Sequence, residues 1–257
     1  MIKKKISLDF DSFPTEIKEY ITGREVYDTS CRSGCSTYYL KPGYYLKVGS
    51  KGTLIREAEL TKLFYDLGFS PELMSFVSVG KDYMLTREAE GEDMLEYLDK
   101  PELVCRILAE SLRELHSRSS DKVPISAQIS SYRGLMSKSL PDDSSCFMKK
   151  SFEFAQKNFH LLKTDDLIHG DACLPNLIVK DGMFSSFIDF DAAGAGDRHI
   201  DLWWALWSLS YNFGTDKYTD LFLDFYGRDR YDPETLRLVN ALECLSDLIN
   251  EVESNDK

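Results

Sequence analysis

Three side chains in the middle of the sequence show the clearest chemical pattern. Asp171 is followed five positions later by Asn176, and Asp189 comes after one further pair of β-prone runs. Carboxylate and amide oxygens are the hard ligands that Mg²⁺ prefers, and a carboxylate also serves as a general base. This set of residue types therefore favours magnesium-assisted phosphoryl transfer.

The segment between these residues predicts a hairpin, because the dipeptide Asp181-Gly182 is a strong two-residue turn signal. Continued in register from this turn, Asn176 falls opposite Phe187, and Asp189 lies just beyond at the same edge. We therefore expect the amide and the second carboxylate to converge. The first carboxylate is expected on the loop that leads into the hairpin.

The first ninety residues contain mainly strand signals. β-prone runs at 37–40 and 44–48 flank the tripeptide Lys41-Pro42-Gly43, which predicts a hairpin. A helix is expected from Gly52-Thr53 to the stop at Gly68, because apolar residues recur there at helical spacing. Two further strands are expected over 73–79 and 83–87, so the order predicts a small sheet with one inserted helix.

After Gly91 the apolar residues recur mainly at helical spacing. Pro101 begins a helix with a continuous apolar stripe that runs to Leu115. Four more helices are expected over 146–163, 200–213, 218–226 and 233–251, with a hairpin of strands 177–180 and 184–190 among them. The polar segment 119–145 has no clear assignment. The sequence thus predicts an α+β fold with a small β-rich N-terminal lobe over residues 1–90 and a large, mainly helical lobe over 91–257.

Composition restricts the class of protein. The 43 acidic and 31 basic residues give a net charge of −12, which argues against a partner with a phosphate backbone or an anionic membrane surface. The most apolar stretch, 202–213, is far shorter than the roughly 20 residues that span a bilayer. No second Cys or His pair completes a zinc site beside Cys31 and Cys35. We therefore expect a cytoplasmic protein with reduced cysteines that binds neither nucleic acid nor membrane.

The central motif resembles that of a known family. The run His-Gly-Asp-Ala-Cys-Leu-Pro-Asn at 169–176, followed by the aspartate after the hairpin, is similar to the catalytic-loop and metal-binding motifs of the protein-kinase-like fold. The tripeptide His-Gly-Asp resembles the corresponding motif of the aminoglycoside phosphotransferase branch of that fold. Together with Asp197, Arg198 and Asp201, the motif is most similar to the aminoglycoside 3'-phosphotransferases.

The resemblance implies a role for each matching residue. Asp171 positions and deprotonates the substrate hydroxyl, while Asn176 and Asp189 hold the Mg²⁺ ions that bridge the phosphates of ATP or GTP. Lys47 contacts the α- and β-phosphates of the nucleotide, and Glu57 pairs with that lysine.

The resemblance also implies further contacts with the nucleotide. Ser33, with the glycine after it, belongs to the short turn that covers the phosphates. Tyr45 stacks on the adenine, and the backbone from Arg87 to Ala89 bonds to its edge. Glu59 is the alternative partner for Lys47. Its spacing from the apolar helix positions places it further than Glu57 from the inward face of the helix.

Other residues near the motif are interpreted as structural. His169 fixes the loop through hydrogen bonds, and Asp201 is a helix cap or a brace of the catalytic loop. His116 and His199 are interpreted as structural or surface residues, and Cys173 has no adjacent base that would make it a nucleophile. The three tryptophans, at 203, 204 and 207, are assigned to the core.

The acceptor site departs from the pattern of the 3'-phosphotransferases. Asp191-Ala192 stands where those enzymes usually have Gly-Arg, and Leu242 replaces the first member of a C-terminal acidic pair whose second member matches Glu243. Asp171 itself, Asp191 and Glu243 are the candidate carboxylates for a polycationic acceptor. The simpler alternatives are a turn residue that bonds its own backbone for Asp191 and a solvated helix residue for Glu243.

The leading hypothesis is an enzyme that transfers the γ-phosphate of ATP or GTP to a hydroxyl of an aminoglycoside antibiotic and so confers resistance. The alternative is a kinase of the same fold that acts on another small hydroxylated molecule, such as a macrolide, an amino alcohol or a sugar. A nucleotide-binding module without turnover is disfavoured because Asp171, Asn176 and Asp189 are all present. A protein kinase is disfavoured because only twelve positions separate Asp189 from Asp201, too few for a long activation segment.

Overall fold

The computed structural model describes residues 4–9, 12–30, 34–140 and 144–255 of the 257-residue chain, and for 247–255 it describes the backbone alone. The chain forms two compact units. The first comprises Met1–Glu92, Ile178–Asp181 and Ser185–Asp191, and the second comprises Asp93–Leu177, Gly182–Phe184 and Ala192–Lys257. The division into lobes of separate function at residue 90 stays a prediction.

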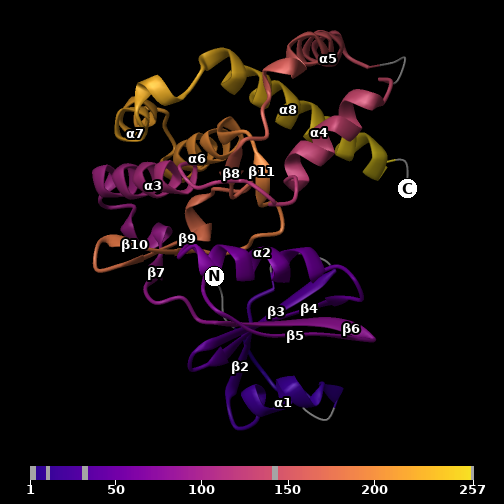
Figure 1. The fold of residues 1–257 in the computed structure, drawn as a ribbon, viewed down its shortest axis with the longest axis vertical. Helices are drawn as coiled ribbons and strands as arrows, with labels where there is room; N and C mark the ends of the chain where they lie inside the picture. Colours follow the sequence, from indigo (N-terminus) through magenta and orange to yellow (C-terminus); the bar gives the residue numbers. More distant parts are fainter. Residues whose placement is uncertain (1–3, 10–11, 31–33, 141–143, 256–257) are drawn as a thin grey trace. The chain divides into compact units, whose positions relative to one another are not determined.

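An antiparallel sheet of six strands forms the body of the first unit (Figure 1). Its strands lie in the order β1-β2-β3-β4-β6-β5. They are β1 (Lys4–Ile6), β2 (Glu25–Asp28), β3 (Cys35–Lys41), β4 (Tyr44–Ser50), β5 (Leu73–Val79) and β6 (Lys81–Arg87). The hairpin expected around Pro42 is confirmed as β3 and β4, in which Leu40 pairs with Tyr44 and Thr37 pairs with Lys47.

Two helices accompany this sheet, α1 (Thr15–Ile21) and α2 (Ile55–Asp66). The second was expected from the sequence, whereas α1 was not. Ile17 of α1 belongs to one apolar cluster with Leu46 of β4, and Ala58 of α2 clusters with Met84 of β6. Because neighbouring strand residues point to opposite faces, Lys47 points to the α2 side of the sheet.

The hairpin expected around Asp181-Gly182 is confirmed as β9 (Leu177–Lys180) and β10 (Met183–Phe187). The second strand ends three residues earlier than the predicted end at 190, because Asp189 adopts a left-handed backbone conformation with φ of 71°. Gly91, just before the short strand β7 (Glu92–Asp93), crosses β9 closely. A Cβ atom at Gly91 would lie 2.2 Å from the carbonyl oxygen of Val179, so only glycine fits there.

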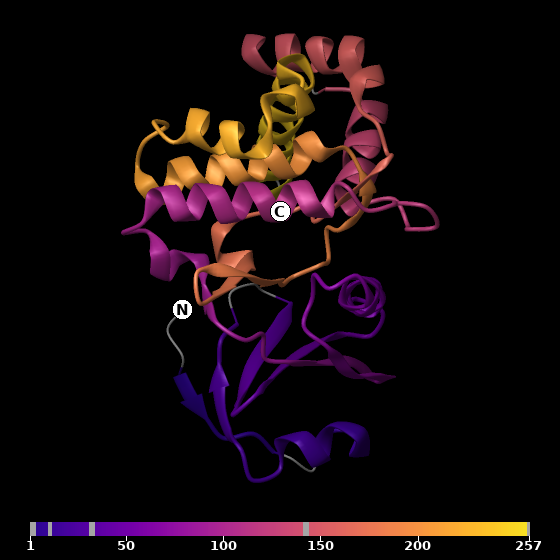
Figure 2. The ribbon, with the colours of Figure 1, turned by 60° about the vertical axis from the view of Figure 1, so that its left-hand side comes forward.

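Helices form most of the second unit (Figure 2). The α-helices are α3 (Pro101–Leu115), α4 (Ala127–Ser137), α5 (Cys146–Asn158), α6 (Arg198–Phe213), α7 (Thr219–Tyr226) and α8 (Pro233–Asn255). The short 3₁₀ helices are η2 (Met94–Tyr97), η3 (Phe159–Leu161), η4 (Leu174–Asn176) and η5 (Arg228–Arg230), and β8 (Asp166–Ile168) pairs antiparallel with β11 (Gly194–Gly196). The segment without a sequence assignment contains α4, whose N-terminus is capped by Ser126 through a hydrogen bond from the Ile129 amide.

The core of the second unit is an apolar cluster shared by α4, α5, α6 and α8, with Tyr132, Phe152, Ile200 and Leu242 among its buried members. α8 packs against both α5 and α6 (Figures 1 and 2). The assignment of every tryptophan to the core is wrong for Trp207, whose side chain is 44% exposed. No helix among the described residues has the length and apolar character needed to cross a membrane.

Candidate active site

A short loop of the second unit brings Asp171 and Asn176 together. The 3₁₀ turn η4 folds the chain back, so that Asn176 Nδ2 donates hydrogen bonds to both the main-chain oxygen and Oδ2 of Asp171, each at 3.0 Å. Gly170, just before, has a φ of 83°, and a Cβ atom there would lie 2.5 Å from the carbonyl oxygen of Ala192. The close approach of Gly170 to Ala192 therefore requires glycine at position 170. The Asn176 amide, in turn, orients the Asp171 carboxylate.

The first anchor of this loop is Asp201, a fully buried residue of α6. Its Oδ2 accepts a hydrogen bond from the His169 amide at 2.8 Å, and its Oδ1 accepts one from the Gly170 amide at 2.7 Å. Nε2 of His116 lies 3.0 Å from the same carboxylate, and the other ring nitrogen of His116 lies 2.9 Å from the Tyr226 hydroxyl. The interpretation of Asp201 as a brace of the catalytic loop is therefore confirmed.

The second anchor is Ser208, which the sequence analysis missed. Its hydroxyl accepts a hydrogen bond from the Leu174 amide at 2.9 Å, at the start of η4. Ser208 lies seven residues after Asp201, which is two helical turns and hence the same face of α6. That spacing is the signal that would have identified it.

The N-terminus of α6 is tied to the strand that precedes the loop. Arg198 forms an ion pair with Asp166 of β8, with Nε 2.9 Å from Oδ2. Asp197 caps the helix by accepting a hydrogen bond from the His199 amide at 2.9 Å. Burial acts to raise the pKa of Asp197, but hydrogen bonds from His199 and Lys163 bring it below its ordinary value. The carboxylate is therefore ionised at neutral pH.

A separate ionic cluster lies in the first unit. Lys47 Nζ lies 2.5 Å from Glu57 Oε1 and also forms an ion pair with Asp189. Burial acts to lower the pKa of Lys47, but the charges of the two carboxylates outweigh it and raise that pKa. Glu57 is buried, whereas its rival Glu59 is exposed, so the expected lysine partner is the one present.

Asp189 stands at the end of the hairpin in an unusual conformation. Its φ of 71° is uncommon for a residue with a Cβ atom, and such conformations gather at functional sites, where the surroundings impose them. Its side chain is 42% exposed, so the carboxylate is paired with Lys47 and still accessible. The predicted convergence of Asp189 with Asn176 stays a prediction, since the two belong to different units.

The remaining predicted nucleotide residues of the first unit have the following surroundings. Tyr45 packs against Tyr39, with ring centroids 5.0 Å apart. Arg87 ends β6 and pairs with Glu72 at 3.0 Å, and Ala89, two residues later, is half-buried. Ser33 lies outside the described residues.

The two carboxylates predicted for the acceptor differ in their surroundings. Asp191 is exposed, and its main-chain oxygen accepts a hydrogen bond from Arg56 Nε at 3.3 Å. Glu243 is only 5% exposed, because α4 covers its part of α8. Its Oε1 accepts hydrogen bonds from Gln128 Nε2 at 2.9 Å and from the Tyr132 hydroxyl. The alternative interpretation of Glu243 as a solvated helix residue is therefore wrong.

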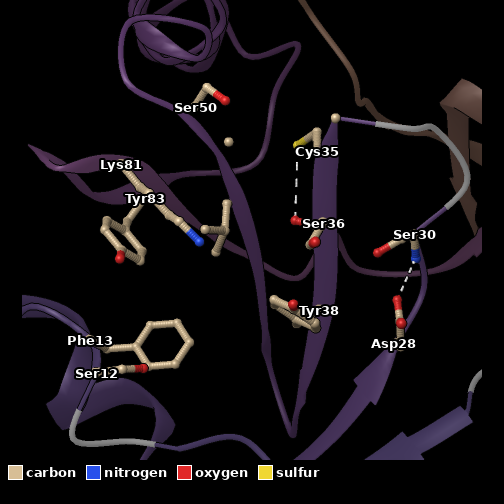
Figure 3. Close-up of a pocket in the computed structure, with 13 residues that line it drawn as sticks. Ser12, Phe13, Asp28, Ser30, Cys35, Ser36, Tyr38, Ser50, Lys81 and Tyr83 are labelled. Atoms are coloured by element: carbon tan, nitrogen blue, oxygen red, sulfur yellow. Dashed lines mark hydrogen bonds between the residues drawn. The ribbon is translucent and has the colours of Figure 1, made fainter.

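A cavity of about 510 Å³ lies in the first unit (Figure 3). It is lined by residues that include Phe13, Val48, Lys81 and Tyr83. Val48 of β4 is among its lining residues, whereas the neighbouring Lys47, whose side chain points to the opposite face of the strand, is not. The cavity is therefore not the space beside the Lys47 ammonium group.

Among the described residues there is no group of three or more His, Cys, Asp or Glu side chains arranged to hold a metal ion. The cysteines at 35, 105, 146, 173 and 244 are free thiols. Burial, with a further contribution from the Asp171 charge, raises the pKa of the Cys173 thiol, so it stays protonated at neutral pH. This protonation state agrees with the absence of a nucleophilic role for Cys173.

Comparison with known proteins identifies the family of the chain. The model of the phosphotransferase enzyme family matches residues 31–239. A probable aminoglycoside 3'-phosphotransferase of Lactococcus lactis is 36% identical over 255 residues, which cover 93% of this chain and 97% of the relative. An aminoglycoside 3'-phosphotransferase of Niallia circulans is 33% identical over 64% of this chain and 67% of its own length.

Solved structures show the same fold. The GDP complex of an aminoglycoside 2'-phosphotransferase superposes with a TM-score of 0.72 at 15% identity, covering 97% of this chain and 94% of the other. The aminoglycoside phosphotransferase APH(3'')-Id of Streptomyces rimosus, in complex with ADP and streptomycin, superposes with a TM-score of 0.61 at 19% identity over 80% of this chain and 90% of its own. These likenesses confirm the predicted α+β, protein-kinase-like fold. Given the family match over most of its length, the chain belongs to the phosphotransferase enzyme family, with relatives named as aminoglycoside 3'-phosphotransferases.

Proposed function

We propose that this kinase-type O-phosphotransferase transfers the γ-phosphate of ATP or GTP to a hydroxyl of an aminoglycoside antibiotic, and so confers resistance. The observation that carries the proposal is the hydrogen-bonded pair of Asp171 and Asn176 on a loop that Asp201 anchors. The names of the relatives and the neighbours solved with ADP and streptomycin, or with GDP and kanamycin, support the choice of nucleotide and acceptor.

Asp171 acts as the base in this proposal. Asn176 Nδ2 donates a hydrogen bond to its carboxylate and another to its main-chain oxygen. The main-chain oxygen also accepts a hydrogen bond from the Cys173 amide at 2.8 Å. A base held in one orientation keeps the acceptor hydroxyl in line with the phosphoryl group, and positioning supplies much of the rate in phosphoryl transfer.

Lys47 binds the α- and β-phosphates, and Glu57 holds the lysine in place. Glu57 is buried, so its carboxylate restricts the position of the ammonium group, which lies 2.5 Å away. Ser33, Tyr45 and the backbone of 87–89 complete the nucleotide site in the proposal.

In this proposal Asn176 of the loop and Asp189 after the hairpin hold Mg²⁺. Because Asn176 Nδ2 is directed to Asp171, the amide oxygen is the atom of Asn176 that can ligate a cation. Asp189 adds a carboxylate that is accessible, and both are hard oxygen donors. The bound cation would neutralise charge on the nucleotide phosphates.

The acceptor carries several ammonium groups, and carboxylates are their natural partners. Asp191 is exposed and suited to such a contact, whereas Glu243 would share its carboxylate between Tyr132, Gln128 and the acceptor. We also assign the enzyme to the cytoplasm, and the free thiols at the described cysteines support this compartment.

A nucleotide-consumption assay tests the function. The purified protein is supplied with MgATP or MgGTP and with a panel of aminoglycosides, a macrolide, an amino alcohol and a sugar, and D171N is the matched inactive control. We expect release of ADP or GDP and a phosphorylated product with aminoglycosides alone. Turnover confined to another acceptor class, or unaltered antibiotic susceptibility of a bacterium that expresses the chain, would contradict the proposal.

A further inference from the structure

Two stacked aromatic side chains on α6 are exposed and have no part in the catalytic geometry described above. Trp207 is 44% exposed and Tyr211 is 73% exposed. Their rings are nearly parallel, with 12° between the planes and 5.2 Å between the centroids. Together they form a stacked, exposed aromatic pair, which we call the aromatic platform (Trp207 and Tyr211).

Two further tryptophans of α6 support the aromatic platform. Trp204 packs edge-on against Trp207, with centroids 5.6 Å apart, and Trp203 packs edge-on against Trp204 at 4.9 Å. The indole nitrogen of Trp203 donates a hydrogen bond to Asn240 Oδ1 of α8 at 3.0 Å. The platform is therefore preorganised, so a ligand that binds it need not order these rings.

The platform lies on α6 next to the side of the helix that holds the catalytic loop through Ser208. An α-helix turns by about 100° per residue, so from Trp203, which contacts α8, Trp207 is displaced by about 40° and Tyr211 by about 80° around α6. Ser208, which bonds the loop at Leu174, is displaced by about 140°. The platform thus lies between the α8 side and the catalytic-loop side of α6, and Tyr211 follows Ser208 by three residues, a spacing that makes neighbours on a helix surface.

We propose that the aromatic platform binds one ring of the acceptor and thereby sets acceptor specificity; this inference rests on the proposed function. An aminoglycoside ring presents C–H groups and ammonium groups, and the face of an indole or phenol ring attracts cations through its quadrupole. The net charge of −12 adds to the attraction of a polycation.

The size of the platform favours this occupant over a second copy of the chain. Two aromatic side chains present at most about 150–250 Å² each, whereas a stable protein interface buries about 800 Å² per partner. A single saturated ring is matched to a surface of the smaller size.

The test compares W207A, Y211A and the double variant with F147A as the matched control. Phe147 is also an exposed aromatic residue of the second unit, 62% exposed on α5. The acceptor is kanamycin, or the aminoglycoside of the panel that is turned over fastest. We expect each platform variant to raise the acceptor KM between about 3-fold and 30-fold, the range of cation–π contacts. The nucleotide KM of the platform variants should equal that of the wild type, and so should the acceptor KM of F147A.

A second readout follows binding without turnover. Titration with the acceptor should change the tryptophan fluorescence of the wild type, and W207F should lose this change while keeping most of the acceptor affinity. If the wild type phosphorylates aminoglycosides but the platform variants keep its acceptor KM, the platform is refuted and the proposed function stands. If no aminoglycoside is turned over, both fall. A dimer that the platform variants dissociate, with KM unaltered, would assign the surface to a second copy and likewise overturn the inference.

Discussion

Replacing Asp201 by asparagine tests how the catalytic loop is held. The carboxylate accepts hydrogen bonds from the amides of His169 and Gly170 and contacts His116, and it is fully buried. In the asparagine variant one of the two oxygens becomes an NH₂ group, which cannot accept a hydrogen bond. Whichever way the amide turns, at least one buried backbone N–H then faces another donor.

The expected loss follows from these contacts. A buried N–H without a partner costs about 1–3 kcal/mol, and the hydrogen bonds that remain each weaken by about 1 kcal/mol, because their acceptor is no longer charged. We therefore expect D201N to lower the free energy of unfolding by about 3 kcal/mol. For a chain of this size that corresponds to a fall in Tm of roughly 6–12 °C.

Urea denaturation followed by far-ultraviolet circular dichroism measures this loss, because the unit that holds Asp201 is mainly helical. D220N is the matched control: Asp220 lies in the same unit, is 82% exposed and pairs with Arg228, so its variant should lose less than about 1 kcal/mol. A loss in D201N of less than about 1 kcal/mol would refute the reasoning. It would show that the bond from Leu174 to Ser208 holds the loop without the carboxylate.

Four further outcomes are expected. D171N should lower turnover at least about 10²-fold, with nucleotide affinity unchanged by calorimetry, because only the base is lost; near-normal turnover would remove Asp171 from that role. D189A should abolish magnesium-dependent nucleotide binding, and a binding isotherm that keeps its magnesium dependence would contradict the metal role. K47A should raise the nucleotide KM and leave the acceptor KM unchanged, as steady-state kinetics with each substrate varied would show; an unaltered nucleotide KM would exclude the phosphate contact. Because burial raises the pKa of Cys173, that thiol is protonated at pH 8 and should resist Ellman's reagent, while the exposed Cys146 reacts; rapid labelling of Cys173, located by mass spectrometry, would argue against the buried thiol.

Local signals predicted most of the elements. The turns at Pro42 and at Asp181-Gly182 were identified from the sequence because a two- or three-residue turn depends on its own residue types. Helix α1 was missed because seven residues offer too little periodicity, and its two buried residues, Ile17 and Ile21, form a single i, i+4 pair.

The ionic pair of Lys47 and Glu57 was expected from the resemblance to a known family, and the helical period selected Glu57 rather than Glu59 as the partner. The anchors of the catalytic loop were only partly predictable. Asp201 was interpreted as a brace, but its partners lie about thirty positions away, and only the folded chain brings them together. Trp207 was misassigned because apolar character does not say which side of a helix remains uncovered.

Helix α6 separates two kinds of position by the side on which they lie. Asp201 and Ser208 are buried against the catalytic loop, where substitution is costly, whereas Trp207 and Tyr211 face solvent, where most substitutions change stability by less than about 0.5 kcal/mol. Selection by a new antibiotic can therefore exchange the exposed side chains of the helix without touching those that hold the loop. The same sixteen-residue segment would let the range of drugs that the enzyme inactivates evolve independently of its rate of phosphoryl transfer.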